Sequence, residues 1–438
     1  MSEDVRVSLE IPAETVFACP VAGLANVLAE RAGFGRRERY RFQLTVEEFC
    51  LCLAGLAEGS RPLALGLTGK RHQLCASFAF QAGNLSLGAL NVTSRASFCT
   101  TDDALAGDIG LFLAGKAADR FHLKHQGADR FLLEATVDRS YPPVAPVRLP
   151  EGLRAPFAIH PNPSPAQLSH AATLAISAYP PWQCPSSFRT PGKFPDMVAE
   201  GQVACILACD ATGQIAGLLP WSPCSGQALY FSGPFVFTPP EMTAGVARLL
   251  VDGFLSAVAR GPHSIVLSFR ATADLPQASF EPLGALQSMT DGRLESHPVV
   301  FRHLREDNGL AVWCAPQLEE FLRQTYDRLA LPRDILPVEV PTGRPRRESL
   351  LGATYDQVRN FAELEPFLDG EDLTANLAAH VAAFRRKGID AILYSMDLAV
   401  PWEAALAGDL IEAGFAPMAV LPQGGQADKV IWQYARLA

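Results

Sequence analysis

The sequence predicts a mixed α/β (α+β) protein built from several domains, and three observations lead to this prediction. The chain has 438 residues, which is too long for one ordinary hydrophobic core. Segments with strand-like character repeatedly alternate with segments whose apolar residues have helical spacing. A proline-rich stretch over residues 139–162 interrupts this alternation, because proline is excluded from regular helices and central strands.

The composition excludes several classes of protein. With 48% hydrophobic and 19% charged residues, the chain is globular rather than disordered or fibrous. A net charge of −9 argues against nucleic acid as the partner. No apolar run is long enough to span a membrane, and the acidic start lacks the layout of a signal peptide. The ten cysteines include no C-x-x-C pair, so we expect reduced thiols in a cytoplasmic protein and no metal site.

The first segment, residues 1–138, has the pattern of a sheet with helices on one face. Apolar residues with helical spacing predict three helices, and alternating residues predict an opening strand, two neighbouring strands and a closing hairpin around Gly127. The predicted helices are Cys19–Ala32, Arg36–Ala57 and Asp108–Ala118.

Beyond the proline-rich linker, Ser164 followed by Pro165 marks a helix start, and that helix is expected to end at Ala178. A hairpin around Gly213 and a strand over residues 228–237 follow. The other helices expected in this half are Thr243–Arg260, Gln317–Leu329, Leu373–Lys387 and Trp402–Glu412.

The helix around LTVEEFCLCLAGLA carries Glu47, Glu48 and Cys52. This arrangement resembles the Glu-Glu-x-x-x-Asn pattern of anti-sigma-factor serine kinases, which belong to the GHKL superfamily with a Bergerat-type ATP-binding fold. The resemblance implies that the glutamates act on water or an attacking hydroxyl and that the asparagine binds Mg²⁺. Cys52 stands at the asparagine position, and a thiol is a poor ligand for Mg²⁺. Working Mg-ATP chemistry is therefore not expected.

Two further positions carry the same resemblance. The Asp-x-Gly motif that accepts the adenine amino group falls on Gln81 and Gly83, and a glutamine oxygen could still accept that hydrogen bond. The glycine-rich lid motif falls on residues 107–111, where Gly110 could bring backbone N–H groups close to phosphate. Asp108 would repel phosphate there. The resemblance implies ATP or ADP as ligand; the alternative is that these are ordinary solvated and turn residues.

Residues 163–307 resemble the GNAT N-acetyltransferases, through a helix, a D-x-x-G hairpin, a strand, a glycine-containing turn and a long helix. The resemblance implies that backbone N–H groups at Gly245 and Ala247 bind the pyrophosphate of acetyl-CoA or CoA. The strand residues before the turn, Phe235, Val236 and Phe237, are assigned to the same cofactor site.

Two positions depart from the GNAT pattern. Met242 replaces the polar first residue of the turn, and Glu241 adds negative charge beside it. Phe280 occupies the position of the family's tyrosine, which acts as the general acid toward the leaving thiolate. Phenylalanine has no proton to donate, so acetyl transfer would need an acid from elsewhere.

Residues 308–438 resemble a second, incomplete GNAT-like unit, because strand, helix, Gly414-Phe415 and strand follow one another. The whole order resembles a bacterial family of regulatory fusions, a resemblance that also rests on Pro422, Asp428 and Gln433-Tyr434. No pyrophosphate-binding glycine pattern precedes this segment. We therefore expect it to serve in packing or partner binding.

The favoured hypothesis is a cytoplasmic bacterial regulatory protein that binds a protein partner, a sigma factor or an antagonist-like protein, through degenerate domains. Glu47 and Glu48 are the candidate catalytic residues of the first site. The alternative is an active GNAT N-acetyltransferase regulated by nucleotide at the N-terminal domain. A third hypothesis is a sensor that binds a nucleotide or acyl-CoA and changes its domain packing.

Overall fold

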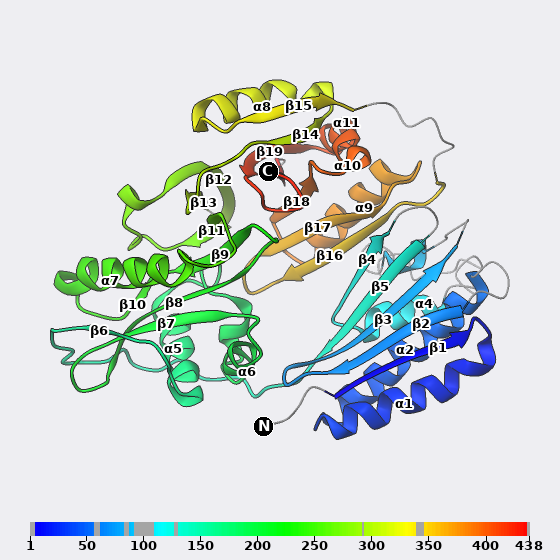
Figure 1. The fold of residues 1–438 in the computed structure, drawn as a ribbon, viewed down its shortest axis with the longest axis horizontal. Coiled ribbons are helices and arrows are strands. Elements are labelled where there is room, and N and C mark those ends of the chain that lie inside the picture. Colours follow the sequence, from blue (N-terminus) through cyan, green and yellow to red (C-terminus); the bar gives the residue numbers. More distant parts are fainter. Residues whose placement is uncertain are drawn as a thin grey trace. The chain divides into compact units, whose positions relative to one another are not determined.

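The computed structural model describes residues 5–56, 62–82, 87–91, 109–126, 130–290, 293–338 and 346–435 (Figure 1). The chain divides into two compact units. Unit 1 comprises Met1–Ser140, Gly343–Thr354 and Leu364–Lys387, and unit 2 comprises Tyr141–Thr342, Tyr355–Glu363 and Gly388–Ala438. The predicted mixed α/β class is confirmed. The predicted boundaries at 138, 162 and 307 stay predictions, and residues 308–438 contribute to both units.

Unit 1 contains an antiparallel sheet in the strand order β1-β2-β3-β5-β4. Its strands are β1 (Val5–Pro12), β2 (Pro62–Gly69), β3 (Gln73–Gln81), β4 (Arg120–His125) and β5 (Arg130–Asp138). Its helices include α1 (Ala18–Arg31), α2 (Arg36–Leu56) and α4 (Ile109–Ala117). These three helices agree with the predicted ones to within one residue at each end.

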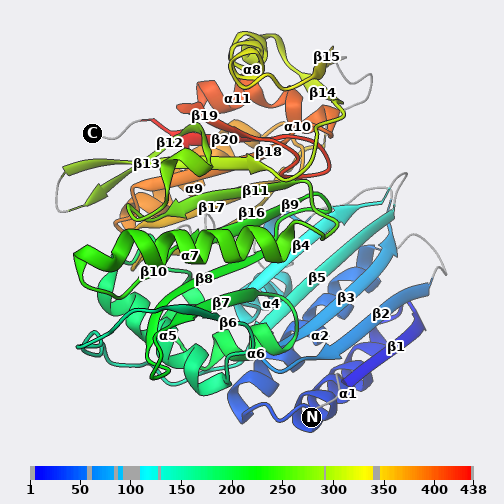
Figure 2. The ribbon, with the colours of Figure 1, turned by 60° about the vertical axis from the view of Figure 1, so that its left-hand side comes forward.

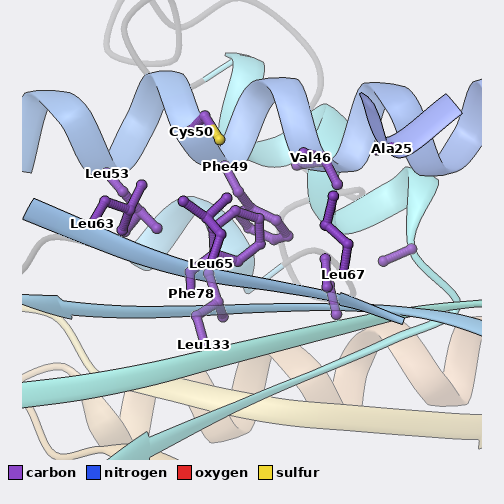
Figure 3. Close-up of a cluster of buried hydrophobic side chains, with 14 of the residues drawn as sticks. Ala25, Val46, Phe49, Cys50, Leu53, Leu63, Leu65, Leu67, Phe78 and Leu133 are labelled. Carbon is purple, nitrogen blue, oxygen red and sulfur yellow. The ribbon is translucent and has the colours of Figure 1, made fainter. Parts of the chain in front are cut away.

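The core of unit 1 lies between α2 and the sheet (Figure 3). Phe49 on α2 and Phe78 on β3 meet edge to face with ring centroids 5.7 Å apart, and both are fully buried. Burial alternates along β3, as expected for a strand with one face against helices. The predicted arrangement of helices against one face of a sheet is thus present, whereas the Bergerat relationship stays a prediction.

A late segment of the chain completes unit 1. Leu350, Phe367 and Leu368, at the ends of β16 (Leu350–Asp356) and β17 (Phe361–Leu368), belong to the same core as the N-terminal helices. The side chain of Asn91 donates to the carbonyl of Ser349 at 2.9 Å and accepts from the Leu351 N–H at 3.1 Å. Helix α9 (Leu373–Arg386) follows.

Unit 2 is built on a sheet in the order β18-β20-β19-β12-β13-β11-β9-β8-β7-β6, with β10 paired to β8. Along this order, only β9 and β11 are parallel among the pairs whose registers are resolved. The strands are β6 (Ala158–His160), β7 (Ala204–Cys209), β8 (Ile215–Pro223), β9 (Ala228–Gly233), β10 (Phe235–Val236), β11 (Ile265–Ala271), β12 (Glu281–Thr290), β13 (Arg293–His303), β18 (Ala391–Asp397), β19 (Phe415–Leu421) and β20 (Lys429–Tyr434).

Helices cover both faces of this sheet around β7 (Figure 2). Ile206 packs with α7 (Pro240–Val258), whereas the next residue, Leu207, packs with α5 (Pro165–Ala178). Successive strand residues point to opposite faces, so β7 is buried on both sides. Helix α5 begins as predicted, with a capping box formed by Ser164 and Gln167.

Several elements differ from the prediction. The single strand expected over residues 228–237 is divided at Gly233-Pro234 into β9 and β10, because proline has no N–H to continue the ladder. The expected helix Trp402–Glu412 is divided into α10 (Pro401–Ala405) and α11 (Ala407–Glu412). A parallel pair, β14 (Leu310–Cys314) and β15 (Arg333–Pro337), flanks α8 (Pro316–Leu329).

None of the helices within the described ranges is long and apolar enough to cross a membrane.

Candidate functional site

The predicted catalytic glutamates lie on α2 of unit 1. Glu47 and Glu48 are half-buried, and Cys52, one turn beyond Glu48, is half-buried on the same helix face. Burial above all, and then the charge of Glu47, raises the pKa of the Glu48 carboxyl. The structure therefore brings these three residues together, with a carboxyl group whose ionisation is disfavoured.

The other predicted nucleotide-binding residues are less closely grouped. Gln81 ends β3 and is paired with Arg130 across the ladder. Gly110 is the second residue of α4, so its backbone lies at the start of a helix, as predicted. Gly83 and Asp108 lie outside the described residues. The assignment of these residues to a nucleotide site stays a prediction.

The predicted cofactor site of unit 2 lies where the pairing of β9 with β11 ends and β10 continues the chain beside β8. Val236, the last residue of β10, does not pair with β11 through its backbone. Instead its N–H donates to the Tyr179 hydroxyl oxygen at 2.7 Å, and the same hydroxyl lies 3.0 Å from its carbonyl oxygen. The hydroxyl also donates to Asp274 at 2.7 Å. The Tyr179 hydroxyl thus accepts from the Val236 N–H, and its single proton goes either to Asp274 or to the Val236 carbonyl oxygen.

Thr272 also bonds to the backbone at the same strand end. The Thr272 hydroxyl donates to the carbonyl of Pro234 at 2.6 Å, and its N–H donates to the carbonyl of Gly233 at 3.2 Å. Burial, followed by the hydrogen bond to Asp274, raises the pKa of the Tyr179 hydroxyl, which therefore stays protonated. The carbonyls of Gly233 and Pro234 at this strand end therefore already have donors within the protein.

The predicted pyrophosphate turn is not a turn. Helix α7 begins at Pro240, so Met242, Gly245 and Ala247 all lie inside it. Proline favours the first position of a helix, and this start at Pro239-Pro240 was not expected from the sequence. The N–H of a residue six positions into a helix belongs to the ladder of that helix. Gly245 nevertheless remains exposed, and a Cβ there would meet nothing within 4 Å.

The aromatic residues assigned to this site are packed in the interior. Phe235 and Phe237 are buried in the core beneath α5, and Val236 belongs to the core beneath α7. Gly217 on β8 makes this packing possible, because a Cβ there would lie 2.9 Å from the Phe235 carbonyl oxygen. Phe280 is buried against Phe231, with ring centroids 5.0 Å apart.

Sequence reasoning did not find Tyr179, Thr272 or Asp274. Tyr179 precedes two prolines, and this context signals only the end of a helix. Its contacts with Val236 and Asp274 span 57 and 95 residues of sequence, so no local pattern indicates them.

A surface cavity of about 650 Å³ lies elsewhere in unit 2. It is lined by His303, Leu304, Arg305, Glu306, Asp307, Leu329, Ala330 and Pro332. None of the predicted site residues lines it.

The comparisons with known proteins bear on part of the chain. No family model matches it, and no curated protein matches it. Among solved structures, a GNAT superfamily phosphinothricin acetyltransferase from Sinorhizobium meliloti in complex with acetyl-CoA is similar, with 14% identity and a TM-score of 0.28 over 34% of this chain and 88% of that one. A spermidine/spermine N-acetyltransferase from Vibrio cholerae has 15% identity and a TM-score of 0.27 over 34% of this chain and 92% of that one.

Both of these acetyltransferases align with about a third of the chain.

Proposed function

We propose that this chain is a regulatory binding protein whose GNAT-like unit does not transfer acetyl groups. The observation that carries the proposal is the occupation of the strand end between β10 and β11. There the Tyr179 hydroxyl contacts the N–H and C=O of Val236, and the Thr272 hydroxyl bonds the Pro234 carbonyl. An acyl-CoA amide or thioester would have to displace these bonds before it could pair with the backbone.

The contacts of the neighbouring positions support the same proposal. The N–H groups of Gly245 and Ala247 lie within the helical ladder, where they are not available to a pyrophosphate. Phe280 is packed in the core and has no proton to donate to a leaving thiolate. The partner that the GHKL resemblance implies for such a protein is a sigma factor or an antagonist-like protein, and it forms part of the proposal.

An acetyltransferase is the second candidate, favoured by two observations. Gly245 is a helical glycine for which the protein has no steric need, although glycine weakens a helix. The protonated Tyr179 hydroxyl is a proton donor at the same strand end. In this second candidate, Tyr179 would supply the proton that Phe280 cannot.

One substitution separates the two candidates. Tyr179→Phe frees the Val236 N–H and removes the hydroxyl group that lies beside the Val236 carbonyl. Under the main proposal, calorimetry should therefore show acetyl-CoA and CoA binding about tenfold tighter than to the wild type. The variant should also lose about 1–3 kcal/mol of unfolding free energy, because Asp274 and Val236 are left unsatisfied.

Tyr141→Phe is the matched control, because it removes a 2.7 Å hydrogen bond to Asp196 elsewhere in unit 2. It should leave the coenzyme affinity unchanged. Release of free thiol from acetyl-CoA by the wild type, with any amine, and its loss in Tyr179→Phe would refute the main proposal and support the transferase.

A further inference from the structure

Three arginines of unit 2 form a cluster that the proposed function does not use. Arg189 ends a short 3₁₀ helix after α5, Arg270 lies on β11, and Arg359 lies in the turn between β16 and β17. All three interact electrostatically with the buried thiol of Cys184. Residues far apart in the sequence thus bring three guanidinium groups close enough to act on one thiol.

Asp356 connects two of these arginines. Its carboxylate forms an ion pair with the Arg189 guanidinium, and its Oδ1 also accepts from the backbone N–H of Arg359 at 3.2 Å. Glu363 interacts with Arg270 and accepts from the Ser395 hydroxyl at 2.8 Å. Asp356 also acts on Arg270 and Arg359. In the described part of the chain, three guanidinium groups thus share the two carboxylates of Asp356 and Glu363, which leaves an excess of one positive charge.

The hydrogen-bonding groups of the arginines are also incompletely used. Nη1 of Arg189 and Nε of Arg359 are buried and have no hydrogen-bond partner. Within the described part of the chain, the guanidinium of Arg359 forms no hydrogen bond or ion pair, and its Cζ lies 5.4 Å from the centre of the Phe361 ring. A buried donor without an acceptor is costly and requires an explanation.

The electrostatics agree with this geometry. Burial above all, and then the charge of Arg270, lowers the pKa of the Arg359 guanidinium to about 9. Burial likewise lowers the pKa of Arg270, and Glu363 only partly offsets this effect. Positive charges held close together destabilise a protein unless a bound anion compensates them.

We infer that Arg189, Arg270 and Arg359 form a binding site for the carboxylate group of a small molecule. A carboxylate carries one negative charge, which matches the single uncompensated positive charge of the cluster. It is planar and can accept two parallel N–H bonds from a guanidinium fork. A dianionic phosphate would reverse the imbalance among these half-buried side chains, where excess charge of either sign is unfavourable. This inference does not depend on whether unit 2 transfers acetyl groups.

Thermal unfolding and calorimetry of the full chain with sodium formate, acetate and propionate, at ionic strength held constant with chloride, test the inference. Wild-type protein should be stabilised in a saturable manner by at least one of these salts. Arg270→Gln and Arg359→Gln should each weaken this binding about 10- to 100-fold, because each removes a charge-assisted bond. Arg248→Gln, on the exposed face of α7, should bind as the wild type does.

The unliganded variants give a second readout. Arg270→Gln removes the excess charge, so it should raise the melting temperature without carboxylate while removing the response to carboxylate. A purely structural cluster predicts the reverse, a lower melting temperature and no carboxylate response in any form of the protein. Arg189→Lys keeps the positive charge but loses the planar guanidinium group. This variant should fold even if a glutamine variant does not, and it should bind the carboxylates more weakly than the wild type.

Two outcomes would overturn the inference. The first is the absence of any saturable, arginine-dependent effect of the three carboxylates. The second is binding of inorganic phosphate with the same dependence on Arg270 and Arg359 while no carboxylate binds, which would replace the carboxylate with a phosphate group. Because no probe contains coenzyme A, either outcome leaves the proposed function untouched.

Discussion

The candidate sites of the two units are defined by different kinds of observation. In unit 1 the candidate residues Glu48 and Cys52 lie one turn apart on a single helix whose packing is regular. In unit 2 the site is defined by contacts, since Tyr179 and Thr272 fill hydrogen-bonding positions at a strand end. A sequence motif can indicate the first kind of site, whereas the second kind becomes visible only when distant residues are seen together.

The largest effect is expected in the core of unit 1. Phe49→Ala removes a fully buried ring that packs against Phe78, and should lower the unfolding free energy by about 3–5 kcal/mol. All five tryptophans, Trp182, Trp221, Trp313, Trp402 and Trp432, belong to unit 2. If the units unfold independently, the variant shifts the circular dichroism transition and leaves the tryptophan fluorescence transition in place.

The matched variant is Phe254→Ala, which removes a fully buried ring from α7 in unit 2. It should move the fluorescence transition instead. A common shift of both signals in both variants would show that the two units unfold as one.

A smaller effect is expected at Asp428, which the sequence pattern of the C-terminal segment singled out. Its carboxylate accepts from Nε of Arg333 at 2.7 Å and from the N–H of Gln423 at 2.8 Å, with the Arg333 side chain fully buried. Asp428→Asn removes the charge and should cost about 1.5–3 kcal/mol, monitored by tryptophan fluorescence. A value near zero would mean that Asp307, 2.8 Å from Arg333, is a sufficient partner by itself.

The smallest effect concerns Glu48 and depends on pH. Because its pKa is raised in the folded state, the folded protein holds this proton more tightly than the unfolded chain. The resulting stabilisation is complete below the ordinary glutamate pKa and is lost as pH rises through the raised value. Glu48→Gln should therefore slightly raise the midpoint of urea unfolding at pH 7 and leave it unchanged at pH 4. A decrease at pH 7 would indicate that the ionised carboxylate stabilises the fold.

Local signals in the sequence predicted much of the fold. Ser164, Pro165 and Gln167 define the start of α5 through a capping box that involves only neighbours in sequence. The alternating burial of β3 follows from its alternating residues. The division at Gly233-Pro234 was missed, because the apolar residues on both sides continue the strand pattern without interruption.

The site was less predictable than the fold. Gly245 fits a phosphate-binding motif, but the two prolines before it start the helix early and place it within the ladder. The ion pair between Arg189 and Asp356 joins residues 167 positions apart. No periodicity or motif encodes such a pairing, since it depends on the tertiary fold.

The interleaved composition of unit 1 has a consequence for its synthesis. Leu350, Phe367 and Leu368 belong to a core whose other members come from the first 140 residues. The intervening residues 141–342 belong to unit 2. At a translation rate of 5–20 residues per second, roughly 10–40 s pass between the synthesis of the amino-terminal sheet and the synthesis of these last core residues. During this interval the core of unit 1 is incomplete, so the apolar side chains that Leu350, Phe367 and Leu368 later cover lack these neighbours.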